Sequence, residues 1–353
     1  MTTITEIALR AEVSPSTVSR VLRDHPQFKV SAACRSRINK IARELNYEPQ
    51  LAGRSLVSGK SYTIVMVLGD MDRDLASPFF AQTLAALGQT LWTKGYALAL
   101  LPVNARHRQT LNNELMRVVR GSRADGFIIP QMFLNSCIIN LLRERHVPVV
   151  TFVAGAQTST FGNEISEVLL DERPAAGDLA KALAQLDHQR ILYFMPTTSH
   201  AFRYKALQAA LRHEGIAVTT QAYTPPFKGF LHDREYARST AAASMHKLIR
   251  YSAIVCSSDL VALGVMDALH EQGLEAGRDI SVVGYDNIEE NANFIVARPF
   301  LATIDRRAYA CGSATAELLL ERIEQPDRPL AARIVPTRFI QRMSLARAKK
   351  MLK

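Results

Sequence analysis

Val13-Ser14-Pro15-Ser16-Thr17-Val18-Ser19-Arg20-Val21-Leu22 is the stretch that decides how the first part of this chain folds. Ser14 is a favourable N-cap, since a serine hydroxyl accepts a hydrogen bond from an unpaired amide of the first turn, and the proline after it needs no N–H partner. Three apolar residues recur at helical spacing and predict one inward face: Val18, Val21 and Leu22. Short hydroxyls and Arg20 occupy the other faces and suit phosphates and base edges. The alternative is an ordinary capped helix with a solvated polar face.

Two further helices flank this stretch. Thr3 to Glu6 fits a capping box and predicts a helix that ends near Ala11. Ser31 caps a third helix with apolar residues at i, i+4, i+7 and i+11: Cys34, Ile38, Ile41 and Leu45. We therefore expect a helix-turn-helix domain over residues 1–46.

Charge is unevenly distributed along the 353 residues. Residues 1–60 hold 10 Lys/Arg and 5 Asp/Glu, whereas residues 61–337 hold 27 basic and 28 acidic residues. A small basic head on a neutral body indicates that the head meets a polyanion such as DNA. The last 16 residues hold 6 basic and no acidic residues, and 347–353 is interpreted as a solvated basic tail.

Several classes of protein are disfavoured by what the sequence lacks. No apolar run approaches the roughly 20 residues of a membrane span, and the polar start has no signal-peptide pattern, so we expect a cytoplasmic protein without a membrane partner. The four cysteines form no C-x-x-C pair and the nine histidines are scattered, so no metal site is predicted. Nucleotide-loop and nucleophile-elbow motifs are missing too, so we expect neither catalysis nor a cofactor.

Beyond residue 62, apolar runs alternate with helical segments. The predicted strands are 63–68, 96–101, 126–129, 148–153, 190–194, 217–223, 253–256 and 281–285. Repeated strand–helix units predict an α/β body with two doubly wound parallel-sheet subdomains, which bind ligands at the carboxyl ends of the strands.

The head resembles the LacI/GalR (lactose/galactose/purine repressor) family of bacterial transcription regulators. The matching residues are Thr3-Ile4, Glu6-Ile7-Ala8, Ala11, Val13-Ser14, Thr17 to Leu22, Val30-Ser31, Ile41-Ala42, Leu45-Asn46-Tyr47, Pro49 and Arg54-Ser55-Leu56. Glu12 departs from the family, which usually has a turn glycine there, and Gly53 replaces the usual alanine. The loop before the third helix is also about two residues longer than the commonest form.

This resemblance implies roles on DNA. Pro15, Ser16 and Arg20 would read bases, with Arg20 contacting guanine. The residues at or beside phosphate-contact positions are Ser14, Thr17, Ser19 and Ser31. Residues 47–61 would form a hinge helix that orders on DNA, in which Arg54 and Ser55 precede Leu56, a minor-groove wedge. A plain linker is the alternative for this segment.

The resemblance extends over the body, where it implies two subdomains of periplasmic-binding-protein type. The landmarks include Asp125-Gly126, Leu186 to Ile191 (LDHQRI), Asp259 to Gly264 and Asp279 to Asp286 (DISVVGYD). We assign 62–155 with 302–330 to the N-terminal subdomain and 156–301 with 331–346 to the C-terminal subdomain.

Four residues are candidates for the effector site, each with a plainer alternative. Asp286 follows a buried strand and would accept from ligand hydroxyls, or cap a loop. Arg203 matches the ligand-facing arginine of the family, or is a solvated helix-start residue. Ser258 could bind the ligand or help to cap a helix, and Phe79 could stack on a ring or be a core aromatic. Residues 223–230 (YTPPFKGF) would be a pocket lid or a surface loop.

These features together predict a homodimeric transcription regulator, most simply a repressor. It would bind a pseudo-palindromic operator, associate with the nucleoid through DNA, and respond to a sugar, sugar phosphate or related metabolite. No leucine heptads follow Ser344, so a dimer is expected rather than a helix-bundle tetramer. The alternative is a cytoplasmic sugar-binding protein that does not read DNA sequence.

Overall fold

The computed structural model forms two compact units, Met1–Lys60 and Ser61–Lys353. The structure describes residues 3–22, 28–47, 59–69, 75, 77–103, 108–121, 124–154, 161, 164–196, 201–223, 233–291 and 298–349. Each unit has its own hydrophobic core.

The head consists of the three expected helices, α1 (Ile4–Ala11), α2 (Pro15–Leu22) and α3 (Ala32–Glu44). Each begins at a hydroxyl that accepts a backbone N–H: Thr3 from Glu6, Ser14 from Thr17, and Ser31 from Cys34. Their apolar faces enclose a small core: Ile7, Ala8, Ala11, Val18, Val21, Ile38 and Ala42.

The turn between α1 and α2 contains Glu12, where the resembling family usually has glycine. Glu12 is the C-cap of α1 and has a left-handed φ of 54°. Glycine adopts this conformation without the steric penalty that a Cβ brings. The glutamate therefore holds a backbone conformation in which a glycine would be less strained.

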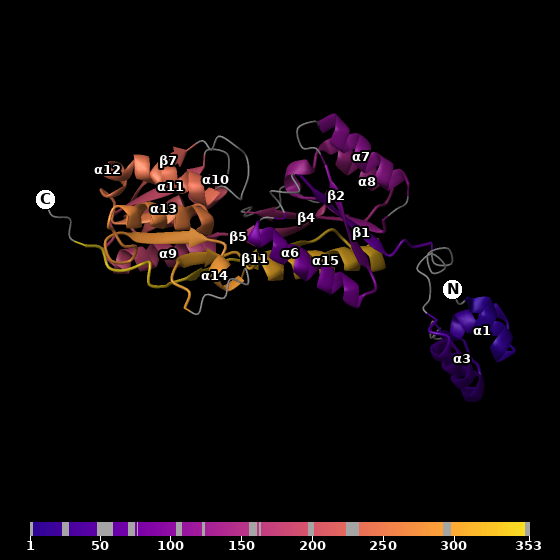
Figure 1. The fold of residues 1–353 in the computed structure, drawn as a ribbon. Helices are drawn as coiled ribbons and strands as arrows, with labels where there is room; N and C mark the ends of the chain where they lie inside the picture. Colours follow the sequence, from indigo (N-terminus) through magenta and orange to yellow (C-terminus); the bar gives the residue numbers. More distant parts are fainter. Residues whose placement is uncertain are drawn as a thin grey trace. The chain divides into compact units, whose positions relative to one another are not determined.

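The first lobe of the second unit is a parallel six-stranded sheet in the order β11-β5-β4-β3-β1-β2. Its strands are β1 (Thr63–Leu68), β2 (Ala97–Pro102), β3 (Gly126–Ile128), β4 (Val149–Ala154), β5 (Ser166–Asp171) and β11 (Ala332–Pro336). As Figure 1 shows, α6 (Pro78–Thr93) and α15 (Ala308–Glu324) cover one face, and α7 (Arg108–Arg120) and α8 (Ser136–Glu144) cover the other. A short 3₁₀ turn, Gln131–Phe133, follows β3.

Helices α6 and α15 approach closely because of one glycine. A Cβ built on Gly312 of α15 would overlap the carbonyl oxygen of Thr83 in α6. The Thr83 hydroxyl also donates to the carbonyl of Phe79, 2.8 Å away within α6, so it leaves no unpaired polar hydrogen at this contact. Only glycine permits the observed spacing of the two backbones.

The second lobe repeats this plan in the order β12-β10-β9-β8-β6-β7, with β12 antiparallel to β10. Its strands are β6 (Arg190–Pro196), β7 (Ala217–Tyr223), β8 (Ala253–Cys256), β9 (Ser281–Tyr285), β10 (Ala302–Asp305) and β12 (Arg338–Ile340). Its helices are α9 (Arg173–Gln185), α10 (Ala201–His213), α11 (Asp233–Ala243), α12 (Met245–Leu248), α13 (Asp259–Glu271) and α14 (Ile288–Asn291). One core lies beneath α9 and α10, and another beneath α11 and α13.

The chain crosses between the two sheets three times, at residues 171–173, 305–308 and 336–338. Every pair of crossovers is tied by a side chain. Arg306 Nε lies 3.5 Å from Glu172 Oε1, the Thr337 hydroxyl donates to the Asp171 carbonyl (2.9 Å), and Arg338 Nε donates to Asp305 Oδ2 (3.0 Å).

The subdomain boundaries inferred from the sequence need correction. Strand β5, not predicted from the sequence, pairs with β4 and so belongs to the first sheet, although 156–301 had been assigned to the other subdomain. Strand β11 pairs with β5 and also belongs to the first sheet, although 331–346 had been assigned to the second subdomain. Conversely, β10 lies within 302–330, which had been assigned to the first subdomain, but it pairs with β9 of the second sheet. Strands β5 and β11 each contain a charged residue, Glu167 and Arg333, so they lack the continuous apolar run that signals a buried strand.

Candidate DNA-reading head and effector site

The polar face of α2 is accessible in the structure. Ser14, Pro15, Ser16 and Arg20 are exposed, and Thr17 and Ser19 are partly exposed. Ser14 Oγ lies 2.7 Å from Ser16 Oγ and 2.9 Å from Thr17 Oγ1, so these hydroxyls form one hydrogen-bonded group at the start of the helix. Ser31, the cap of α3, is exposed as well.

A helix N-terminus with exposed hydroxyls and one cation suits a phosphate backbone. The unpaired amides and the helix dipole of α2 favour a negative group there, and Arg20 adds a long donor beyond them. Three other predicted DNA contacts, Arg54, Ser55 and Leu56, lie outside the described residues, as does nearly all of 223–230.

Arg203 and Asp286 come together at the carboxyl ends of the second sheet. Arg203 lies in α10, which follows β6, and Asp286 directly follows β9. Arg203 Nη2 is 3.6 Å from Asp286 Oδ1, and both side chains are at most 5% exposed. Arg203 also donates through Nη1 to the Ser257 carbonyl, and its Cζ lies 5.1 Å from the centroid of the Tyr285 ring.

A second ion pair, missed in the sequence, joins this one. Arg306 follows β10 on one crossover, and Glu172 follows β5 on another. Arg306 Nη1 lies 3.4 Å from the same Asp286 Oδ1, and Arg306 Nε lies 3.5 Å from Glu172 Oε1. Two arginines therefore converge on one carboxylate oxygen, and all four side chains are buried. Neither residue was singled out in the sequence, because the strands that precede them, β5 and β10, were not predicted there.

The two remaining candidates have structural partners. Phe79 is 8% exposed and packs into the core of the first lobe. The Arg306 guanidinium carbon lies over one face of its ring, 4.0 Å from the ring centroid. Ser258 is the N-cap of α13, where its hydroxyl accepts from Val261 N at 3.3 Å. Phe79 thus borders the cluster, while Ser258 performs the capping role that was its alternative.

The cluster is rich in polar atoms without hydrogen-bond partners. No described residue makes a hydrogen bond to either carboxylate oxygen of Glu172 or to Arg306 Nε. The same holds for the hydroxyls of Ser257, Tyr193 and Tyr285. Burial raises the pKa of Glu172 and of both tyrosines, and lowers the pKa of Arg306. Buried polar groups are normally hydrogen-bonded, so this density of atoms without a hydrogen bond is what a polar ligand site would show.

The loop that carries Asp286 is held from below by Asp259. Asp259 accepts the Thr303 hydroxyl at 2.6 Å and Ile288 N at 2.8 Å, and a Cβ on Gly284 would overlap it. Burial raises the pKa of Asp259 well above its usual value. Asp286 itself has a φ of 105°, a conformation that non-glycine residues rarely adopt. Such strained residues cluster at binding sites.

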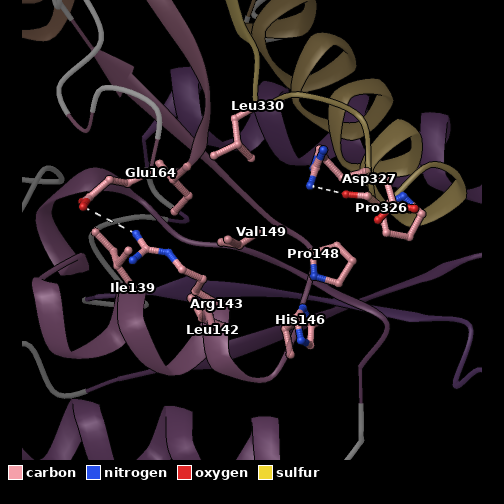
Figure 2. A pocket seen from close by; sticks show the side chains of 13 residues that line it. Ile139, Leu142, Arg143, His146, Pro148, Val149, Glu164, Pro326, Asp327 and Leu330 are labelled. Atoms are coloured by element: carbon pink, nitrogen blue, oxygen red, sulfur yellow. Dashed lines mark hydrogen bonds and ion pairs between the residues drawn. The ribbon is translucent and has the colours of Figure 1, made fainter.

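A separate hollow of about 330 Å³ lies at the opposite ends of the first-lobe strands, near the start of β4. Figure 2 shows Arg143 of α8 reaching toward Glu164 above an apolar floor that includes Val149; the two charged groups are 3.5 Å apart. Arg322 donates to the Pro326 carbonyl at 2.8 Å. The charged rim is thus largely paired within the chain.

The described part of the chain lacks two further features. No helix there is long and apolar enough to cross a membrane. No group of three or more His, Cys, Asp or Glu side chains there could hold a metal ion.

Comparison with known proteins decides the family. The model of bacterial regulatory proteins of the lacI family matches residues 3–50, and that of the periplasmic binding protein-like domain matches residues 180–345. The HTH-type transcriptional repressor CytR of Escherichia coli (strain K12) is 27% identical over 354 residues, covering 97% of this chain and 96% of that protein. The chain belongs to the lacI family. This lacI-family member is a transcription regulator with a DNA-binding head, not an enzyme.

Solved structures share the fold of this lacI-family chain. The lac repressor dimer bound to operator and the anti-inducer ONPF has a TM-score of 0.76 and 23% identity, covering 98% of this chain and 99% of that one. A lacI-family regulator from Enterococcus faecium with bound ribose has a TM-score of 0.64 and 23% identity, covering 81% of this chain and 100% of that one. The predicted arrangement, a helical head and two parallel-sheet lobes, is confirmed.

Proposed function

We propose that this regulator is a homodimeric repressor that binds a pseudo-palindromic operator and is controlled by a small molecule at the Arg203–Asp286 cluster. The single observation that carries the proposal is the buried, incompletely hydrogen-bonded cluster in a chain whose head presents a reading helix. A body that only bent DNA would have no use for such a cluster.

On DNA, the roles follow the accessible face of α2. Arg20 reads a guanine, and Pro15 and Ser16 contact neighbouring base edges. Ser14, Thr17, Ser19 and Ser31 contact phosphates and set the register. Arg54, Ser55 and Leu56 belong to a hinge that orders on the operator, where Leu56 enters a base step.

The effector is a sugar or a related hydroxylated metabolite. Supporting this, the neighbour from Enterococcus faecium is described with bound ribose. Arg203 and Asp286 supply donor and acceptor groups on opposite sides of one ion pair, as polyol recognition requires. Phe79 borders the ligand. The Ser258 hydroxyl already accepts a hydrogen bond as the cap of α13, so only its remaining hydrogen-bonding capacity is available to the ligand. Effector and operator affinities then change by the same factor in both directions.

A second copy of the chain covers α6 and the edge strand β2. Trp92 on α6 is 77% exposed, and Leu100 on β2 is 36% exposed, although both are large apolar side chains. The lac repressor structure is described as a dimer. Trp92→Asp should therefore give a monomer in sedimentation and weaken operator binding, because two heads no longer bind together.

The protein acts in the cytoplasm, on the nucleoid.

The experiment that tests the function is selection of bound sequences from a random duplex library at two salt concentrations. Non-specific affinity falls steeply with salt, so a true site persists in the enriched pool at the higher concentration. We expect a palindromic site with a central pyrimidine–purine step, and with Arg20→Ala weaker enrichment and relaxed preference at one base of each half-site. If the wild-type protein selects no sequence, with or without added sugars, the proposal fails and the sugar-binding alternative replaces it.

A further inference from the structure

The geometry points to Arg306 as a built-in occupant of the effector site, which an effector carrying hydrogen-bond donors must displace. The inference rests on the proposed function, since it assigns the occupant of the same cluster. It also narrows the ligand to a molecule that offers N–H or O–H donors to two carboxylates.

The position of Arg306 is that of a ligand. Its guanidinium group lies between the carboxylates of Glu172 and Asp286, and against the ring face of Phe79. Glu172 and Phe79 approach it from the first-sheet side, and Asp286 approaches from the end of β9 in the second sheet. Two acceptors and one aromatic face are what a donor-rich ring compound would also use.

Arg306 makes longer contacts than two other arginines of the chain, Arg234 and Arg342, make to their hydrogen-bond acceptors. Its approaches to Asp286 and Glu172 are 3.4 and 3.5 Å, against about 2.7–2.9 Å for a good charge-assisted hydrogen bond. Arg234, on the surface, makes two bonds of 2.7 and 2.8 Å to Asp267. Arg342, also buried, donates at 2.7 Å to Asn287 and at 2.8 Å to the Leu301 carbonyl. Arg306 thus lacks the short hydrogen bonds that fix the guanidinium groups of Arg234 and Arg342.

Displacement of Arg306 fixes the charge of the ligand. The cluster would then hold one cation, Arg203, beside two acidic side chains, Glu172 and Asp286. Both Glu172 oxygens accept no hydrogen bond from any described residue even with Arg306 in place. An entering molecule with hydroxyl or amino donors satisfies these oxygens, whereas an anion is repelled.

The test is chemical rescue with the guanidinium ion, which needs neither DNA nor an identified effector. Arg306→Ala is titrated with guanidinium chloride from 0 to about 20 mM, well below the molar range used for unfolding, and Tm is followed. We expect a saturable rise of about 3 °C once guanidinium is tenfold above its Kd. The wild-type protein, which already holds this group, should show no rise.

The controls separate this site from general salt effects. Arg234→Ala, which removes a guanidinium from an exposed pair, should show no saturable rise, and equal sodium chloride should give none in any variant. If Arg306→Ala does not fold, Arg306→Gln replaces it, because the shorter amide leaves room for part of the ion. No saturable rise in the folded variant overturns the inference, and so does a rise with sodium acetate instead. A failed operator selection would leave this result unchanged.

Discussion

Arg20 of α2 lies against Phe28, with its guanidinium carbon 5.2 Å from the ring centroid. The contact restrains a long side chain that would otherwise lose rotamer freedom on binding, so the cation is positioned before DNA arrives. An arginine held in this way is suited to reading one base edge.

Arg20→Ala should therefore reduce affinity for the selected operator by about 5- to 150-fold, equivalent to about 1–3 kcal/mol, and affinity for random duplex much less. Arg10→Ala is the matched control, since Arg10 is an exposed cation of the same head that pairs with Glu6. Fluorescence anisotropy at one salt concentration measures both duplexes. Equal losses on the two duplexes would contradict a base-reading role.

Asp286→Asn should destabilise the body by about 3 kcal/mol, because Arg203 and Arg306 would keep their charges in a buried site without their shared carboxylate. Asp267→Asn breaks an ion pair in which Arg234 is 52% exposed, and should change stability by at most about 1 kcal/mol. Urea unfolding measures both. Similar losses in the two variants would show that the buried cluster contributes no more than a surface pair.

Glu172 should make stability depend on pH. Burial raises its pKa above the ordinary value of 4.5, so between that value and the folded-state pKa the native protein binds more protons than the unfolded chain. The free energy of unfolding therefore falls as pH rises through this window. Glu172→Gln removes the effect, and the variant should gain stability relative to wild type from pH 4 toward neutrality in urea titrations. A constant difference across that range would rule this out.

Gly312→Ala should destabilise the first lobe by about 1–3 kcal/mol, because the added methyl group overlaps the Thr83 carbonyl and forces α6 and α15 apart. Gly177, within α9, has no atom within 4 Å of a built Cβ. Gly177→Ala should instead stabilise by about 0.5–1 kcal/mol through helix propensity. Thermal unfolding of the two variants tests the pair, and a tolerated Gly312→Ala would mean that the helices can separate freely.

Local features of the chain were the most predictable. The caps Thr3, Ser14 and Ser31 and the 3.6-residue periodicity defined the head, because each signal lies within a few residues of the structure it specifies. The site residues Arg203 and Asp286 followed from the family resemblance, and the structure brings them together.

Features that depend on distant partners were not predictable. Whether β5 joins the first or the second sheet is decided by its pairing with β4 and β11, which the local sequence does not encode. Glu172 lies just after that unpredicted strand, so its approach to Arg306, more than a hundred residues away, had no sequence signal. For the same reason, the sequence did not decide whether Phe79 is a core residue or a ligand contact. Its ring packs in the core of the first lobe and also lies against the Arg306 guanidinium group.

The order of the strands has a consequence for synthesis in the cell. The first sheet begins with β1 near residue 63 but receives α15 and its edge strand β11 only when residue 336 has been made. At about 5–20 residues per second, the intervening chain takes roughly 15–55 s to emerge. For the part of that time after β5 is complete at residue 171, its open edge and the apolar surface that α15 later covers remain available to other chains. Nascent protein should therefore depend on chaperones and on slow expression at low temperature, even though in the finished molecule β11 pairs with that edge of β5 and α15 covers that surface.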